Sequence, residues 1–249
     1  KLETHFKVIY GDEFIDEGIS RIKSLSQKYN LSQVDPVSIK DVWTHEDHIL
    51  ITYGDMVQPG VGEPVSKLCK QHEFLKEYLN DEISSVHILP FFPSSSDDGF
   101  SVVDYRRVDE RIGGWDDIRH LSRDFRLMGD LVMNHASRYS EWFKNYLNNK
   151  KPHNDYFIEI DPDTDLSDVT RPRSTPLLTP VHTKNGEKFV WSTFSDDQID
   201  VKFANPDVLF EYLDIFFYYL NKGLSVIRLD AVAFIWKEIG TSCIHLKET

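Results

Sequence analysis

Short apolar runs alternate with helical patterns along most of the chain. Four runs indicate strands, at residues 48–53, 85–89, 127–133 and 223–231. Apolar residues at helical spacing predict helices between them, over residues 65–79, 115–125 and 207–220. Because these runs lack polar alternation, we expect strands that are buried on both faces. The alternation favours an α/β fold with a parallel sheet and helices outside it, either a barrel or an open doubly wound sheet.

Polar residues follow each predicted strand. In chain order they are Gly54-Asp55, Asp97-Asp98, Asn134-His135, and Arg228 with Asp230. The carboxyl ends of parallel strands meet at one edge, where ligands bind in both architectures. Arg228 and Asp230 lie two residues apart on one strand, so their side chains point to the same side. The pattern predicts a functional site at this edge, and the alternative for the last strand is a buried ion pair that only closes the fold.

Two segments do not follow this alternation of predicted strands and helices. Residues 1–43 form a predicted N-terminal extension, whose apolar positions from Phe14 to Tyr29 recur at helical spacing. Residues 136–200 are too long for an ordinary loop and contain several aromatic residues, which indicates an inserted subdomain overhanging the sheet edge. Within it, residues 156–160 and 189–191 are predicted short strands.

Composition narrows the class of protein. The 249 residues carry a formal net charge of −13, which argues against a nucleic-acid surface. The chain shows no secretory signal, and its apolar stretches fall short of the roughly 18 residues that a membrane span needs. Its two cysteines, Cys69 and Cys243, lie far apart, and reduced thiols in the cytoplasm are the simplest interpretation.

Several motifs, taken in order, resemble one enzyme family. They are Leu89-Pro90-Phe91-Phe92-Pro93, Asp97-Asp98-Gly99-Phe100, Asp130-Leu131-Val132-Met133-Asn134-His135, Arg171-Pro172-Arg173, Arg228-Leu229-Asp230-Ala231 and the stretch from Lys237 to Cys243. From about residue 48 onward the chain resembles the α-amylase superfamily, glycoside hydrolase family 13. The resemblance is to its sucrose phosphorylase branch, whose members act on sucrose, sucrose 6-phosphate, glucosylglycerate or glucosylglycerol.

The resemblance implies a TIM-type (β/α)8 barrel of which about the first four strands are present. Residues 44–135 would form the first part of the catalytic barrel, with strands one to three. Residues 136–200 would be the B subdomain inserted after strand three, and residues 201–249 would continue the barrel through strand four.

The resemblance also implies roles for individual residues. Asp230 matches the nucleophile and Arg228 the arginine that orients it. The glucose subsite would contain Asp97, Phe100, His135, Phe194 and Gln198, whereas Asp130 matches a structural acid. Phe234 stands where sucrose phosphorylases usually carry a tyrosine, which disfavours sucrose. Arg171 and Arg173 are candidate phosphate ligands, with two surface arginines as the alternative.

These matches imply the amino-terminal part of a retaining α-glucoside phosphorylase. It would transfer glucose from an α-glucoside to inorganic phosphate through a covalent glucosyl-enzyme and release glucose 1-phosphate. The family's acid/base glutamate falls after Thr249 and Glu238 does not match it, so we expect residues 1–249 alone to be inactive. An amylase-like hydrolase, a glucosyltransferase or a non-catalytic fragment is the alternative. No metal and no cofactor are expected, and the acceptor and oligomeric state stay open.

Overall fold

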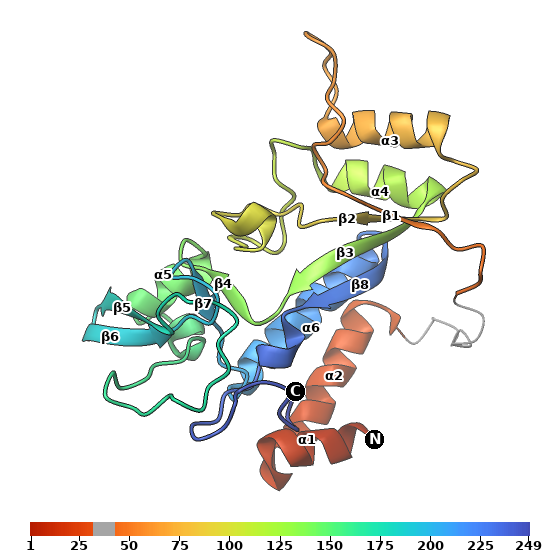
Figure 1. The fold of residues 1–249 in the computed structure, drawn as a ribbon. Coiled ribbons are helices and arrows are strands. Elements are labelled where there is room, and N and C mark those ends of the chain that lie inside the picture. The colour runs from red at the N-terminus through yellow and green to blue at the C-terminus, as the bar shows by residue number, and fades with distance from the viewer. Residues whose placement is uncertain (32–42) are drawn as a thin grey trace.

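The sheet has the predicted topology. The computed structural model describes residues 1–31 and 43–249, so residues 32–42 of the predicted extension lie outside the described residues. A four-stranded parallel sheet runs in the order β1 (Ile49–Thr52), β2 (Ser85–Ile88), β3 (Arg126–Val132) and β8 (Leu224–Asp230). The intervening helices are α3 (Lys67–Tyr78), α4 (Trp115–Asp124) and α6 (Pro206–Asn221) (Figure 1). All four predicted strands and all three predicted helices are therefore present.

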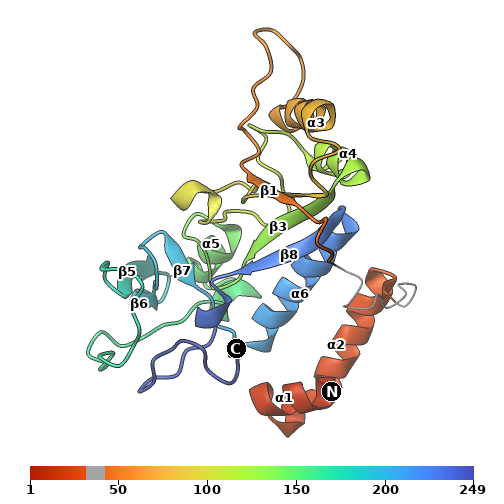
Figure 2. The same ribbon diagram turned by 45° about the vertical axis from the view of Figure 1, so that its right-hand side comes forward.

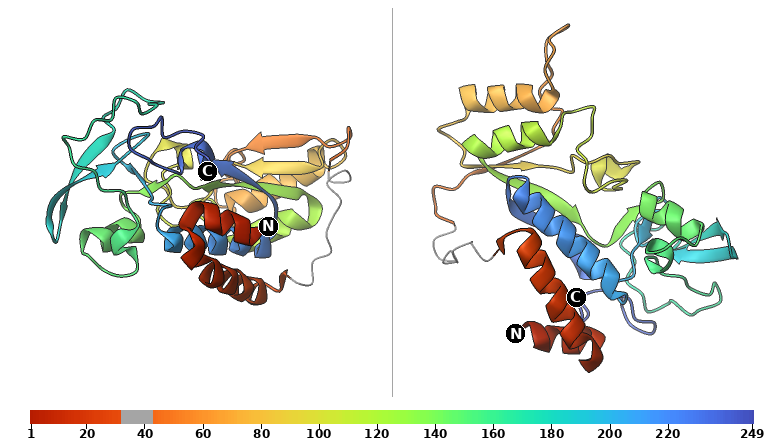
Figure 3. Two further views of the ribbon diagram at one scale, coloured as in Figure 1. Left: turned by 90° about the horizontal axis from the view of Figure 1, so that it is seen from below. Right: turned by 180° about the vertical axis from the view of Figure 1, so that it is seen from behind.

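Local sequence explains where the helices begin. The Ser66 hydroxyl accepts a hydrogen bond from the Cys69 amide at 3.0 Å and so caps α3. Asn205 caps α6 in the same way through the Asp207 amide at 2.9 Å, and Pro206 follows at a position where a missing N–H does no harm. The helices lie on one face of the sheet, as Figure 3 shows, and their buried apolar residues join those of β2 and β3 in the main core.

Burial on both faces is correct for β2 but wrong for the two outer strands. Ile51 of β1 is 62% exposed and Leu229 of β8 is 43% exposed. Leu50 packs against the core and Thr52 accepts a hydrogen bond from Gln71 of α3, so alternation turns Ile51 to the opposite face. Among the described residues, the helices cover only one face, and both strands lie at sheet edges.

The N-terminal extension forms a second helical layer. Its predicted helix is α2 (Ile15–Lys28), and the pattern missed a preceding helix, α1 (Leu2–Tyr10). Phe6 and Phe14 pack on Phe210 of α6, which places this layer outside the helix that leads into β8 (Figure 2). An ion pair of 2.8 Å between Arg21 and Asp207 adds to the contact.

The inserted segment is more regular than predicted. It contains α5 (Glu141–Leu147), the hairpin of β5 (Leu178–Thr183) and β6 (Gly186–Trp191), and an antiparallel pair, β4 (His135–Ser137) with β7 (Gln198–Asp200). The predicted strand at residues 189–191 is the end of β6. The one at 156–160 is wrong, because only Phe157 and Glu159 make isolated bridges. Figure 1 shows the insertion beyond the carboxyl end of β3, and the domain boundaries stay a prediction.

Within the described residues, no helix is long and apolar enough to cross a bilayer.

Candidate active site

Adjacent strands bring Asp130, Arg228 and Asp230 together. β3 and β8 pair in parallel so that Asp130 lies opposite Arg228 and Val132 opposite Asp230. Arg228 Nη1 is 2.5 Å from Asp130 Oδ1 and 2.9 Å from Asp230 Oδ1. The second oxygen of the fully buried Asp130 lies 2.8 Å from His87 Nε2. Asp130 therefore holds the guanidinium, and the guanidinium holds Asp230.

The Asp230 carboxylate has a partly desolvated environment. Burial raises its pKa above the ordinary value, while the positive charge of Arg228 opposes that rise. A carboxylate that is held in place with few water molecules around it is suited to attack an electrophilic carbon.

Three of the predicted sugar ligands form a chain of polar contacts. Gln198 Nε2, at the start of β7, donates to Asp97 Oδ2 at 2.9 Å and lies 3.1 Å from His135 Nε2. The side-chain oxygen of Gln198, Oε1, accepts from the Ser195 hydroxyl at 2.9 Å, which fixes the orientation of the side-chain amide. Residues from the β2 loop, β4 and β7 thus converge, although they are far apart in the sequence.

His135 Nε2 has two neighbours that need opposite roles. It lies 3.1 Å from both the Phe100 carbonyl and Gln198 Nε2, and Nδ1 lies 3.4 Å from Asn134 Nδ2. A protonated Nε2 donates to Phe100, whereas an unprotonated Nε2 accepts from the Gln198 amide, so the tautomer decides which of these two hydrogen bonds forms. Complete burial lowers the pKa of His135, and the opposing effect of Asp200 and the Phe100 carbonyl does not cancel this. The ring is therefore neutral at pH 7.

Aromatic side chains wall the same region. The His135 and Phe194 rings lie 5.1 Å apart, and Phe194 meets Phe234 edge to face at 5.5 Å. Arg228 lies over the Phe100 ring at 5.9 Å. All three phenylalanines predicted for the substrate pocket therefore contact another member of the predicted set.

The turn that carries Asp97 has an unusual backbone. Asp97, Asp98 and Gly99 in succession adopt positive φ angles of 55°, 49° and 105°. A Cβ atom on Gly99 would lie 2.7 Å from the Pro90 carbonyl oxygen, so this position requires glycine. Consecutive residues in this region store strain that the surrounding structure must hold.

Sequence reasoning missed a buried cation beneath the site. Lys237 Nζ lies 2.8 Å from Asp200 Oδ2 and donates to Asn134 Oδ1 at 2.9 Å and to the Phe234 carbonyl. Asp200 also accepts from the Thr193 amide at 2.9 Å. The ammonium group occupies an oxygen-lined cage, and no group of three or more His, Cys, Asp or Glu positioned for a metal occurs in the described ranges. The signal for it in the sequence is the position of Lys237 at the start of the stretch from Lys237 to Cys243, which contributes to the family resemblance.

Within the part of the chain that the structure describes, neither candidate phosphate ligand is joined to Asp230 by a hydrogen bond or ion pair. Arg171 donates to the Thr175 carbonyl within its own exposed loop. Thr175 donates to the Phe194 carbonyl at 3.0 Å, so the loop adjoins the aromatic wall. Within the described residues, no hydrogen bond or ion pair joins Arg173 to the other site residues. The phosphate-binding roles stay a prediction.

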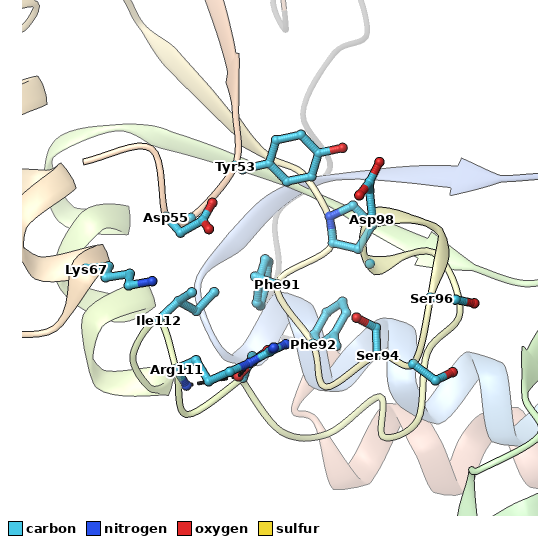
Figure 4. Close-up of a pocket in the computed structure, with 15 residues that line it drawn as sticks. Tyr53, Asp55, Lys67, Phe91, Phe92, Ser94, Ser96, Asp98, Arg111 and Ile112 are labelled. Atoms are coloured by element: carbon cyan, nitrogen blue, oxygen red, sulfur yellow. Dashed lines mark hydrogen bonds and ion pairs between the residues drawn. The ribbon is translucent and has the colours of Figure 1, made fainter. Parts of the chain in front are cut away.

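A cavity of about 560 Å³ is lined in part by Asp98 and Gly99 of the strained turn. Figure 4 shows Tyr53 and Asp55 after β1, Asp98 from the turn, and Lys67 and Arg111 at its rim. Neither His135 nor Asp230 lines it.

Comparison with known proteins gives the family. Residues 72–244 match the family described as alpha amylase, catalytic domain. The chain is 53% identical over 205 residues to a glucosylglycerate phosphorylase of Allomeiothermus silvanus, covering 82% of this chain and 36% of that protein. It is 43% identical over 254 residues to the glucosylglycerate phosphorylase of Escherichia coli, covering 100% of this chain and 44% of that protein. The chain thus spans less than half the length of these relatives.

Solved structures give the fold. The crystal structure of sucrose 6F-phosphate phosphorylase from Thermoanaerobacter thermosaccharolyticum superposes with a TM-score of 0.75 at 30% identity, covering 84% of this chain and 44% of that one. The trehalulose synthase MutB from Pseudomonas mesoacidophila gives a TM-score of 0.66. The four-stranded sheet corresponds to about the first strands of the TIM barrel of these enzymes, so the fold prediction is confirmed. The chain therefore belongs to the α-amylase catalytic-domain family, glycoside hydrolase family 13.

Proposed function

We propose that the polypeptide containing this chain is a retaining α-glucoside phosphorylase with Asp230 as its nucleophile. One observation carries the proposal: Arg228 holds the Asp230 carboxylate at 2.9 Å at the tip of β8. His135 is itself linked to Asp97 through Gln198. A carboxylate nucleophile beside neutral and acidic hydrogen-bonding groups suits a glucose ring bound by its hydroxyls.

The reaction has two displacements. Asp230 attacks the anomeric carbon of the bound α-glucoside, and the bond to the aglycone oxygen breaks as that oxygen takes a proton from an acid group. Inorganic phosphate then attacks the glucosyl ester and gives a proton back to the acid group, which frees the Asp230 carboxylate and releases α-glucose 1-phosphate. Asp97, His135 and Gln198 hold the sugar through both steps, and Arg228 keeps the carboxylate oriented.

We further propose that the acid group comes from sequence other than residues 1–249. A retaining enzyme needs a second carboxyl group roughly 5–5.5 Å from the nucleophile. Asp130 is near Asp230 but is fully buried and paired with both Arg228 and His87. Both of its oxygens are occupied by these partners and shielded from a bound substrate, so we expect the chain alone to show no turnover.

Glucosylglycerate is the substrate that we propose first. The relatives with 53% and 43% identity carry the name glucosylglycerate phosphorylase, whereas a sucrose phosphorylase of Bifidobacterium adolescentis is 33% identical. Phe234, which lies against Phe194, lacks the hydroxyl of the tyrosine expected in sucrose phosphorylases.

The free Cys69 and Cys243 support the cytoplasmic location predicted from the sequence.

An assay for glucose 1-phosphate tests the proposal. The complete polypeptide is incubated with glucosylglycerate, glucosylglycerol or sucrose, with and without inorganic phosphate. We expect phosphate-dependent release of glucose 1-phosphate, fastest from glucosylglycerate. Release of free glucose at the same rate without phosphate would identify a hydrolase and contradict the proposal.

The isolated chain of 249 residues is assayed in parallel. We expect no release from any of the three glucosides. Turnover by this chain would show that the acid group lies within it, and the assignment of Asp130 as a purely structural group would then be wrong.

A further inference from the structure

Asp197 binds four serine hydroxyls at once. Its Oδ2 accepts from Ser95 at 2.6 Å, from Ser101 at 2.9 Å and from Ser96, while Oδ1 accepts from Ser137 at 3.4 Å. Burial tends to raise the pKa of this carboxyl group, but the serine hydrogen bonds outweigh it and leave the pKa below its ordinary value. The ionised carboxylate is therefore the favoured partner of these hydroxyls.

The four serines come from two different parts of the fold. Ser95, Ser96 and Ser101 flank the strained turn after β2, and Ser137 ends β4. Ser95 Oγ also lies 2.7 Å from Ser137 Oγ and 3.1 Å from Ser101 Oγ. On its backbone side, the Asp197 carbonyl accepts from the Arg138 amide at 2.8 Å. One carboxylate thus joins the turn to both strands of the β4–β7 pair.

The turn needs such support. Asp97 and Asp98 are non-glycine residues with φ angles of 55° and 49°, a conformation that costs about 1–3 kcal/mol for each residue. The backbone hydrogen bonds around it run from Phe100 N to Asp97 O at 2.9 Å, from Ser101 N to Ser96 O at 3.3 Å and from Ser95 N to Ser101 O at 3.0 Å. The adjacent Ser95 and Ser96 hydroxyls bound to Asp197 supply the remaining anchors.

The position of Asp197 in the sequence connects the serine cluster to Asp97. Asp197 immediately precedes Gln198, whose amide donates to Asp97. Asp197, which binds the serines, therefore lies directly before β7, and Gln198, which meets Asp97, is the first residue of that strand. A shift of Asp197 relative to the serines would change the distance between Gln198 and Asp97.

We propose that Asp197 is a positioning residue that locks the turn at residues 97–99, so that Asp97 presents its carboxylate to the glucose subsite. The subsite rests on the proposed function, whereas the lock itself does not. Asp197 does not touch the sugar in this account, because its carboxylate is occupied by serine hydroxyls. Its effect reaches the substrate through Asp97.

Hydrogen exchange tests the lock without any substrate. The variants are Asp197→Ala and the milder Asp197→Asn, and the matched control is Asp196→Ala. Asp196 directly precedes Asp197, its side chain is 77% exposed, and it pairs with Arg138 at 3.5 Å. We expect Asp197→Ala to speed exchange of the Phe100 and Ser101 amides about tenfold or more, with a smaller effect of Asp197→Asn. The amides of β2 and β3 should exchange as before, and the control should match the unmodified chain.

Unchanged exchange at Phe100 and Ser101 in Asp197→Ala would overturn the proposal. If this variant does not fold, the double variant Ser95→Ala, Ser96→Ala removes two anchors from the other side and leaves the carboxylate in place. It should speed exchange at the same two amides, and failure to do so would equally overturn the proposal.

Kinetics of the complete polypeptide separate positioning from a general loss of structure. Asp197→Asn should raise KM for the α-glucoside about tenfold and change kcat much less, because Asp97 binds the sugar before and during reaction. A fall in the apparent kcat with KM unchanged would mean that less of the enzyme is folded and active. That result would indicate a purely structural role and count against the proposal. If the unmodified polypeptide shows no turnover, the proposed function fails while the exchange result stands independently.

Discussion

Lys237 and Asp200 form a buried ion pair that joins the loop after β8 to the inserted segment. Their charged atoms lie 2.8 Å apart, and the side chains are 4% and 0% exposed. Asn134, next to His135, accepts from the same ammonium group and donates to Asp200 at 2.9 Å. The pair therefore ties together the loop that follows Asp230, the strand that carries Gln198 and the tip of β3.

Lys237→Met should destabilise the protein strongly. It leaves the Asp200 carboxylate buried without its counter-charge, which typically costs about 3–5 kcal/mol in free energy of unfolding. Urea unfolding of the chain measures the loss. Adding Asp200→Asn to Lys237→Met should recover part of it, because the uncompensated charge is then removed.

A surface pair provides the control. Lys188 and Glu159 also lie 2.8 Å apart, but both are more than a third exposed. Lys188→Met should therefore change the free energy of unfolding by at most about 1 kcal/mol. Equal effects of the two lysine substitutions would show that burial does not strengthen the dependence of Asp200 on its partner.

The sequence was sufficient to place the strands and the residues at their ends. Asp97, His135, Arg228 and Asp230 all follow or end apolar runs, and parallel strands bring their carboxyl ends to one edge. This part could be predicted because a short apolar run between helical patterns has few other interpretations. The contact between Arg228 and Asp230 followed from their spacing on one strand.

Contacts that cross between segments could not be predicted. Nothing local in the sequence pairs Lys237 with Asp200, or Asp197 with Ser95, since each pair forms only when the insertion folds back onto the sheet edge. Exposure of Leu229 was missed for a related reason. A strand's apolar composition reports what can be buried, but its place at an edge depends on which strands are beside it.

Gly99→Ala should weaken both folding and sugar binding. The new Cβ would meet the Pro90 carbonyl oxygen at 2.7 Å in a residue with φ of 105°. Backbone strain alone accounts for about 1–3 kcal/mol, and the clash adds to it. Gly186→Ala is a close control, because its φ is 106° and nothing lies within 4 Å of the added carbon. Thermal unfolding should show a larger loss for Gly99→Ala, and equal losses would remove the steric argument.

Burial of neutral His135 predicts a pH dependence of stability. Its pKa is lowered in the folded protein, so the unfolded chain binds the proton more readily. Stability contributed by this residue is therefore lost as the pH falls below its ordinary value of 6.5 and is regained as the pH rises. His153 has a lowered pKa for the same main reason, burial, so a single unfolding curve does not isolate His135.

The comparison that isolates it is His135→Asn against the unmodified chain. The difference in free energy of unfolding between the two should shrink as the pH is lowered from about 7.5 to 5, because only the unmodified chain carries the penalty of protonating residue 135. Urea unfolding at several pH values measures this difference. A difference that is constant across the range would mean that His135 titrates alike in the folded and unfolded states.

Asp230→Asn should abolish formation of the glucosyl-enzyme in the complete polypeptide. The amide keeps the shape of the carboxylate but is neutral, so it cannot form the ester that stores the glucosyl group. Incubation with an activated glucosyl donor such as a glucosyl fluoride, followed by mass spectrometry of the intact protein, detects one added glucosyl unit in the unmodified enzyme. The control variant Asp196→Asn, which removes an exposed carboxylate in the inserted segment, should be labelled normally. Labelling of Asp230→Asn to the same extent would place the nucleophile elsewhere, whereas loss of labelling with intact folding would assign it to the carboxylate that Arg228 holds at 2.9 Å.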